Sequence, residues 1–239
     1  MTLYRNYDII LSVLQMEKSK INQIKSKERV REHGEVFTAE REVKAMCDLV
    51  KDDTERIDSR FLEPACGDGN FLAEILTRKL AVVRKKYGKS PLDYEKNAVL
   101  AASSIYGVDI LQDNVDACRK RMFEIWNKEY SAVCKKECNE QTRDAVRFIL
   151  FRNIVCGNAL TLKCVDENGN DTDEPIVFSE WSFITGSSMQ RCDYTFEELL
   201  ADNTSDNGGQ QSLFDQEKNP EGKFLKRYIS HYRRVQENG

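Results

Sequence analysis

One run of residues, from Phe61 to Leu72, has the residue types and spacing to hold a small ligand. Its apolar start predicts a buried strand, and Pro64 ends that strand because proline cannot donate to a sheet ladder. Gly67 and Gly69 then allow a tight turn and a close backbone approach to a ligand. Apolar residues at helical spacing over 71–87 predict a helix directly afterwards. A strand, a Gly-x-Gly turn and a helix form a nucleotide-type site, in which backbone N–H groups at the helix start bind the ligand.

The NAD fingerprint does not fit this run, because its third glycine would fall at Leu72. The sequence Pro-Ala-Cys-Gly-x-Gly-x-Phe-Leu instead resembles motif I of the adenine-N6 DNA methyltransferases of restriction–modification systems. The resemblance implies a Rossmann-like, three-layer α/β sandwich with a mostly parallel sheet that binds S-adenosylmethionine (SAM). The residues that would then contact the cofactor here are Glu63, Pro64, Ala65, Gly67, Asp68, Gly69, Asn70 and Phe71.

A second short apolar run, residues 105–110, ends in an acid. An aspartate at the carboxyl end of such a strand accepts both hydroxyls of a ribose; the alternative is an ordinary cap or loop carboxylate. The run resembles the family's Tyr-Gly-x-Asp-Ile segment. Asp109 would then hold the ribose, and Ile110 would pack on the adenine.

A third strand and turn is predicted over residues 153–160. It resembles the family's Asp/Asn-Ala-Leu segment, which implies that Asn158, with Ala159 beside it, contacts the adenine. The alternative is an asparagine that only supports its own turn.

Residues 33–39, His-Gly-Glu-Val-Phe-Thr-Ala, precede a predicted helix that Thr38 is placed to cap. The segment resembles motif X of the same family, in which a Phe-Thr pair helps to hold the methionine end of SAM. Ala39 replaces the proline usual in the family.

The family's catalytic loop, Asp/Asn-Pro-Pro-aromatic, accepts hydrogen bonds from the two amine hydrogens of the flipped adenine, which raises the electron density on its nitrogen, and stacks on its ring. The four prolines of this chain, at 64, 91, 175 and 220, include no adjacent pair. No catalytic residue is therefore predicted, and no target-recognition domain is visible. The resemblance covers roughly residues 28–164, the cofactor half of such an enzyme.

The rest of the chain changes in character. Residues 162–165 and 176–184 predict two strands of an appended hairpin, joined by an acidic Asn-Gly turn. Residues 201–221 predict a mobile linker. The basic tail, 222–239, has apolar residues at helical spacing, for which we expect a partner-protein contact first and DNA second; docking on the chain's own core is the other alternative. An N-terminal helical segment, 1–58, and a SAM-binding domain, 59–200, complete the predicted organisation.

The chain has 239 residues, 40% of them apolar and 32% charged, and a formal net charge of −4. No run is long enough to span a membrane, and the eight scattered cysteines suggest reduced thiols in a cytoplasmic protein. Their spacing is poor for zinc, so no metal is predicted.

These observations favour a SAM-dependent DNA adenine-N6 methyltransferase-type protein without its catalytic loop. DNA and a partner subunit that carries the missing loop or a recognition domain are the expected partners. The alternatives are a non-catalytic SAM-binding scaffold subunit and a methyltransferase that acts on a small molecule or a protein.

Overall fold

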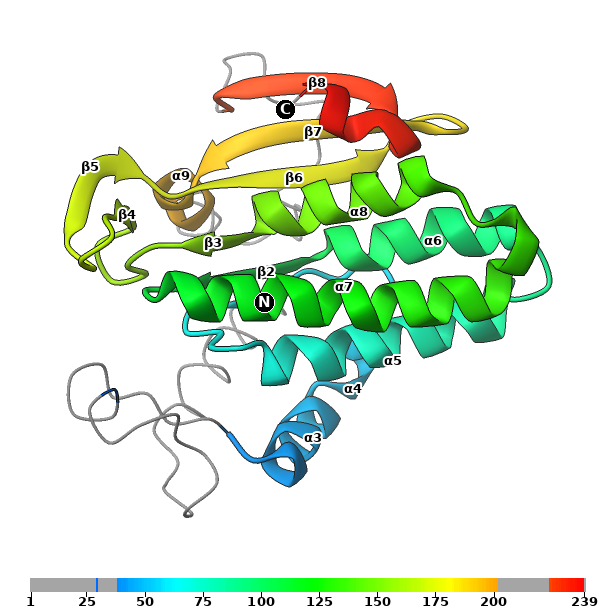
Figure 1. Ribbon diagram of the computed structural model, residues 1–239, viewed down its shortest axis with the longest axis horizontal. Coiled ribbons are helices and arrows are strands. Elements are labelled where there is room, and N and C mark those ends of the chain that lie inside the picture. Colours follow the sequence, from blue (N-terminus) through cyan, green and yellow to red (C-terminus); the bar gives the residue numbers. More distant parts are fainter. Residues whose placement is uncertain (1–28, 30–37, 202–223, 239) are drawn as a thin grey trace, which may run out of the picture.

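The computed structural model describes residues 29, 38–201 and 224–238. Within them the chain is a mixed α/β protein, in which long helices cover a small parallel sheet and a separate antiparallel sheet lies alongside (Figure 1). The element order is α3 (Glu40–Leu49), α4 (Lys51–Thr54), β1 (Phe61–Glu63), α5 (Asn70–Tyr87), α6 (Pro91–Ser103), β2 (Ile105–Asp109), α7 (Gln112–Cys134), η1 (Lys135–Glu137), α8 (Glu140–Asn153), β3 (Ile154–Cys156), β4 (Lys163–Val165), β5 (Asp171–Pro175), β6 (Val177–Phe183), β7 (Ser188–Thr195), α9 (Phe196–Ala201), β8 (Lys226–His231) and η3 (Tyr232–Asn238).

The parallel sheet has the order β1-β2-β3, so the strand before the glycine turn pairs with the strand that ends in an acid. Phe61 lies opposite Ile105, and Asp109 lies opposite Cys156. The strands are short, and α6 and α8 each lead almost directly into one of them. Their carboxyl ends meet at one edge, where the predicted site residues follow.

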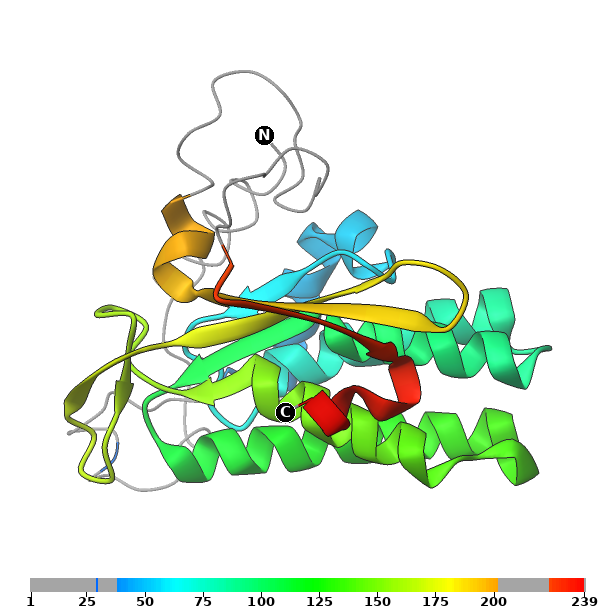
Figure 2. The ribbon, with the colours of Figure 1, turned by 90° about the horizontal axis from the view of Figure 1, so that it is seen from above.

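The two faces of this sheet have different covers. Phe61, Ile105 and Ile154 belong to the main core, with buried residues of α5 to α8. The opposite face, which includes Tyr106 and Val108, packs against Ile176, Phe178 and Phe196. The second cover is therefore not a helical layer but a strand and the short helix α9 (Figure 2). Among the described residues, five of the eight strands pair antiparallel. The prediction of a mostly parallel sheet holds only for β1, β2 and β3; the other strands form separate antiparallel sheets.

Local signals fixed most helix boundaries. Ser90 caps α6, with Pro91 in the first position, as its sequence predicts. Thr38 does not cap α3: Ala39 is the N-cap residue, and no side chain bonds there. Residues 1–37 of the predicted N-terminal helical segment lie outside the described residues, apart from Arg29, and they include most of the motif X segment.

The appended hairpin pairs differently from our prediction. The acidic turn joins β4 to β5, and β6 pairs instead with β7 and through it with β8. Asp166 holds the turn by accepting from the backbone N–H groups of Asn168 and Asn170. We call residues 163–175 the acidic hairpin; it projects at one end of the molecule in Figure 1.

The described part of the tail is a strand followed by a 3₁₀ segment, not one helix. Tyr232 and Val235 are buried in the main core. The Tyr232 hydroxyl donates to the buried carboxylate of Glu95 over 2.5 Å, and Arg233 donates to the same oxygen over 2.6 Å. The tail thus packs on the chain's own core, the alternative to which we had given less weight than to a partner.

Replacing Tyr232 with alanine is expected to lower the free energy of unfolding by about 3–5 kcal/mol, the usual cost of deleting a large buried ring. It also removes a donor from the buried Glu95 carboxylate. Urea unfolding measures the loss. Arg234→Ala is the control, because that exposed side chain forms only a 4.0 Å ion pair with Glu237. Equal small losses in both variants would show that the tail is not part of the core.

Candidate functional site

The predicted site residues meet at the carboxyl ends of the parallel strands. We call residues 63–71, 109–114 and 157–159 the strand-end site. Backbone bonds fasten its three parts together: Cys66 N–H donates to the Val108 carbonyl over 2.9 Å, and Gly157 N–H donates to the Asp109 carbonyl over 2.9 Å. All three parts therefore depend on β2, the central strand.

The glycine turn adopts the conformation that its sequence predicts. Gly67 and Gly69 have φ angles of 53° and 87°, a region that residues with a Cβ rarely occupy. Gly69 is the N-cap residue of α5, and no side chain caps that helix. The N–H groups of its first turn, which have no intrahelical partners, are therefore placed to meet a polar ligand.

Asp109 joins the glycine turn to the second strand. Its Oδ2 accepts from Gly67 N–H over 2.9 Å, and its Oδ1 accepts from Leu111 N–H over 2.9 Å and from Asn114 Nδ2 over 3.2 Å. A carboxylate has about four acceptor positions, so these bonds leave limited capacity for a ligand. A ribose would have to share the carboxylate or displace a bond.

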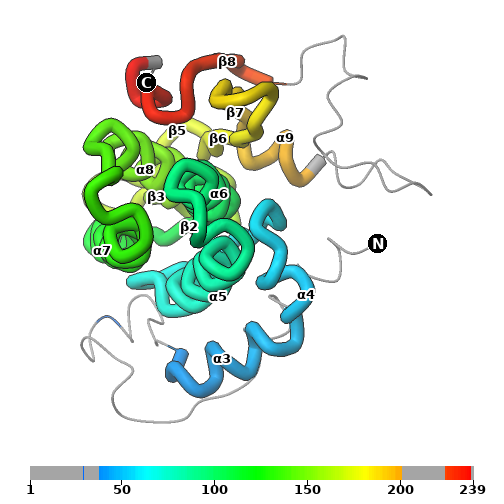
Figure 3. Tube along the Cα trace, turned by 90° about the vertical axis from the view of Figure 1, so that its right-hand side faces the viewer, coloured from blue at the N-terminus to red at the C-terminus, as the bar shows by residue number. Residues whose placement is uncertain are grey.

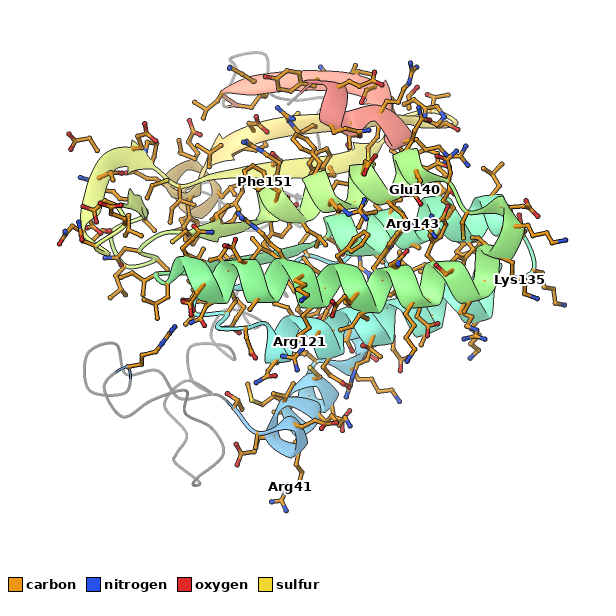
Figure 4. All side chains as sticks on the ribbon, in the orientation of Figure 1. Arg41, Arg121, Lys135, Glu140, Arg143 and Phe151 are labelled. Carbon is orange, nitrogen blue, oxygen red and sulfur yellow. The ribbon has the colours of Figure 1, made fainter. Side chains whose placement is uncertain are left out.

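Arg121, on α7, bonds to the helix-start side of the turn. Its guanidinium donates to Asn70 Oδ1 over 2.6 Å and to Asp68 Oδ1 over 3.3 Å, and it lies between α7 and α5 in Figure 4. Both members of the Arg121–Asp68 ion pair are partly exposed, so the pair adds at most about 1 kcal/mol. Its effect is to orient the two polar side chains that the resemblance assigns to the cofactor.

Glu63, the last residue of β1, is a buried carboxyl group at the site. Burial raises its pKa to about 7, and the backbone N–H of Ala65 opposes that rise. The group therefore keeps its proton to a higher pH than an ordinary glutamate does. It can either accept or donate a hydrogen bond at the strand end.

The third part of the site is engaged within its own loop. Asn158 Oδ1 accepts from Leu160 N–H over 3.0 Å, and its Nδ2 donates to Asp171 of the acidic hairpin over 3.0 Å. This is the geometry of an asparagine turn, the alternative kept open above. Ile110 and Ala159 are half-buried beside it, whereas Leu160 is 94% exposed.

The predicted residues from Glu63 to Phe71, Asp109 and Ile110, and Asn158 and Ala159 all follow or end strands at the same edge of the sheet. Gly67 and Asp109 are joined by a hydrogen bond, whereas the Asn158 side chain bonds within its own loop and to the acidic hairpin. Thr38 is exposed ahead of α3, a helix that packs on α5 (Figure 3). Sequence reasoning missed Asn114, Cys118 and Arg121, which all contact the turn or Asp109 from α7. Their spacing of three to four residues, on a helix that begins just after Asp109, is the signal that could have indicated them.

No protein-family model, curated protein or solved structure matches the chain. Within residues 29, 38–201 and 224–238, no helix is long and apolar enough to cross a membrane, and no group of three or more potential metal ligands occurs. All eight cysteines are free thiols.

Replacing Gly69 with alanine is expected to destabilise the protein more than replacing Gly169, a glycine of the acidic hairpin. Both have positive φ, which costs an alanine about 1–2 kcal/mol. A Cβ at Gly169 meets nothing within 4 Å, but one at Gly69 would lie 2.6 Å from the Sγ of the buried Cys118. Thermal unfolding of the two variants compares them. Adding Cys118→Ala to Gly69→Ala should restore part of the loss; equal losses at the two glycines would contradict the close packing.

Glu63→Gln is expected to flatten the pH dependence of the unfolding free energy. The folded protein keeps the Glu63 proton up to a pKa of about 7, while the unfolded chain releases it near 4.5. The folded state thus binds more protons in this window, so wild-type stability falls as pH rises, by about 3 kcal/mol in total from this group.

Denaturant unfolding across the same pH window measures the difference between wild type and Glu63→Gln. Glu180, whose pKa burial also raises to about 7, contributes equally to both proteins. Glu124→Gln, an exposed change on α7, serves as the control. Parallel curves for wild type and Glu63→Gln would show that Glu63 titrates normally in the folded protein.

Proposed function

We propose that this chain is the SAM-binding part of a DNA adenine-N6 methyltransferase-type protein of a restriction–modification system, and that it transfers no methyl group alone. The observation that carries the proposal is the Gly67–Asp109 bond at the ends of two adjacent parallel strands. That bond supports the proposal of a nucleoside site, because the glycine turn and a strand-end carboxylate lie next to each other at the same edge of the sheet.

Each proposed role in SAM binding belongs to a residue of the strand-end site. The amides at the start of α5 would meet the methionine part of SAM, and Asp109 would hold the ribose. Ile110 and Asn158 would contact the adenine, which requires Asn158 to share or exchange its present partners. Glu63 would accept or donate one hydrogen bond beneath the turn. A Rossmann-like methyltransferase fold belongs to the same proposal, supported by the β1-β2-β3 order and by the glycine turn.

The absence of a Pro-Pro-aromatic sequence favours a version in which a partner chain supplies the catalytic loop. The acidic hairpin favours it too. The hairpin lies beside the site, because its Asp171 accepts a hydrogen bond from Asn158. Its exposed carboxylates are Asp166, Glu167, Asp171, Asp173 and Glu174. Phosphates approaching this edge would be repelled unless a partner's basic surface covers the hairpin.

Calorimetric titration with SAM is expected to show one site, and Asp109→Ala is expected to weaken binding by about 1–3 kcal/mol, the cost of unpaired ribose hydroxyls. Asp109→Asn keeps the side chain's shape and one acceptor oxygen, so it separates charge from structure. Asp116→Ala, an exposed carboxylate of α7, is the control. No heat at millimolar SAM with folded protein would refute the cofactor assignment.

The purified chain is expected to transfer no labelled methyl group from SAM to duplex DNA of mixed sequence, because its sequence has no Pro-Pro-aromatic loop to accept hydrogen bonds from the adenine amine. Scintillation counting of recovered DNA, followed by nucleoside analysis, measures this. Adding a chain that carries Asn-Pro-Pro-Tyr should restore transfer. Clear N6-methyladenine from the pure chain would show that its own residues complete the active site.

A further inference from the structure

The end of the helical layer opposite the strand-end site is rich in exposed lysines. They come from the last turn of α5, the loop 88–90 and the segment that follows α7. We call this surface the basic end; its exposed cations are Lys85, Lys86, Lys89, Lys135 and Lys136. Three exposed carboxylates accompany them, Asp93, Glu137 and Glu140, and the partly exposed Glu129 pairs with Arg84.

Two contacts hold these segments side by side. Arg84 on α5 pairs with Glu129 on α7 over 3.2 Å, and the Cys134 thiol at the end of α7 donates to the Pro91 carbonyl at the start of α6 over 3.5 Å. The helix ends and loops that carry these lysines therefore lie at one end of the helical layer, and that end faces the viewer in Figure 3. Lys135 marks its tip in Figure 4.

Cations near helix C-termini are common, because they complement the helix dipole. That effect extends over about the last turn of a helix, so it accounts for Lys85 and Lys86 and also acts on Lys135, the C-cap residue of α7, whereas Lys89 follows the C-cap residue of α5. Lys135 has φ 51° and ψ −112°, a conformation suited to glycine. A lysine there costs about 1–3 kcal/mol of backbone strain, which a solvated charge does not offset.

Two surfaces of opposite charge lie at opposite ends of the part of the chain that the structure describes. The chain as a whole carries −4, yet the acidic hairpin and the basic end lie at opposite ends of it (Figure 1). Such a distribution orients an approaching polyanion toward the lysines and away from the hairpin.

We propose that the basic end binds the phosphate backbone of duplex DNA. The choice of DNA over another polyanion rests on the proposed function; the lysine surface itself does not. Contact at this end anchors the chain on DNA independently of sequence. It leaves the strand-end site free for SAM and for a partner.

Fluorescence anisotropy with a short labelled duplex of mixed sequence tests the contact. The slope of log K against log salt is expected to be about −4 to −5 for five phosphate contacts. Lys85→Gln, Lys86→Gln and Lys89→Gln together are expected to reduce its magnitude by about 3 and the low-salt affinity by at least tenfold. The matched control changes Lys44, Lys51 and Lys120 to Gln, three exposed lysines outside the basic end and the basic tail with the same loss of charge.

A single change, Lys135→Gly, separates binding from stability. It is expected to raise the melting temperature, because glycine relieves the strain, while it weakens DNA binding. Equal losses of affinity in the two triple variants would overturn the proposal, and so would unchanged binding in the basic-end variants. Binding to phosphatidylserine vesicles without binding to DNA would also overturn it. Calorimetry with SAM on the same proteins reports on the cofactor site separately, so failure of one proposal is distinguishable from failure of the other.

Discussion

The bond from the Gly67 N–H to the Asp109 carboxylate, 2.9 Å long, is the interaction on which the strand-end site depends. It joins the turn after β1 to the end of β2. Asp109 also accepts hydrogen bonds from the Leu111 N–H and the Asn114 side chain at the start of α7. One side chain thereby fixes the turn, the strand end and the next helix relative to one another. Strands of three to five residues supply little rigidity themselves, so the helices must hold them in register.

Core packing of α5 supports the Gly67–Asp109 bond. Leu72, Ile75 and Leu76 of α5 are fully buried, so the helix that starts at the glycine turn cannot shift along the sheet without opening the core. Gly69 lies so close to Cys118 that α5 and α7 meet at the turn itself. Binding geometry and core packing are thus set by the same few residues, which is why changes at the turn are expected to affect both.

Sequence reasoning predicted the parts of the fold that depend on short-range signals. Pro91 after Ser90, the two glycines of the turn and the acid at the end of β2 each specify local backbone, and all were placed correctly. The pairing of β6 with β7 and β8 was missed, because strand partners distant in sequence leave no local pattern. The tail was read as a helix for the same reason: its apolar residues also fit a strand followed by a 3₁₀ turn. Within the site, Asp109 and Asn158 were named, but their internal bonds and the role of Arg121 follow only from tertiary contacts.

The central claim is that SAM occupies the glycine turn beside Asp109. Amide NMR on ¹⁵N-labelled protein tests it most directly, by following the resonances of Gly67 and Gly69 during addition of SAM. The account predicts that both shift progressively and saturate together, and that Gly169 in the acidic hairpin does not move. Saturable shifts confined to other residues, with both turn glycines unchanged, would contradict it.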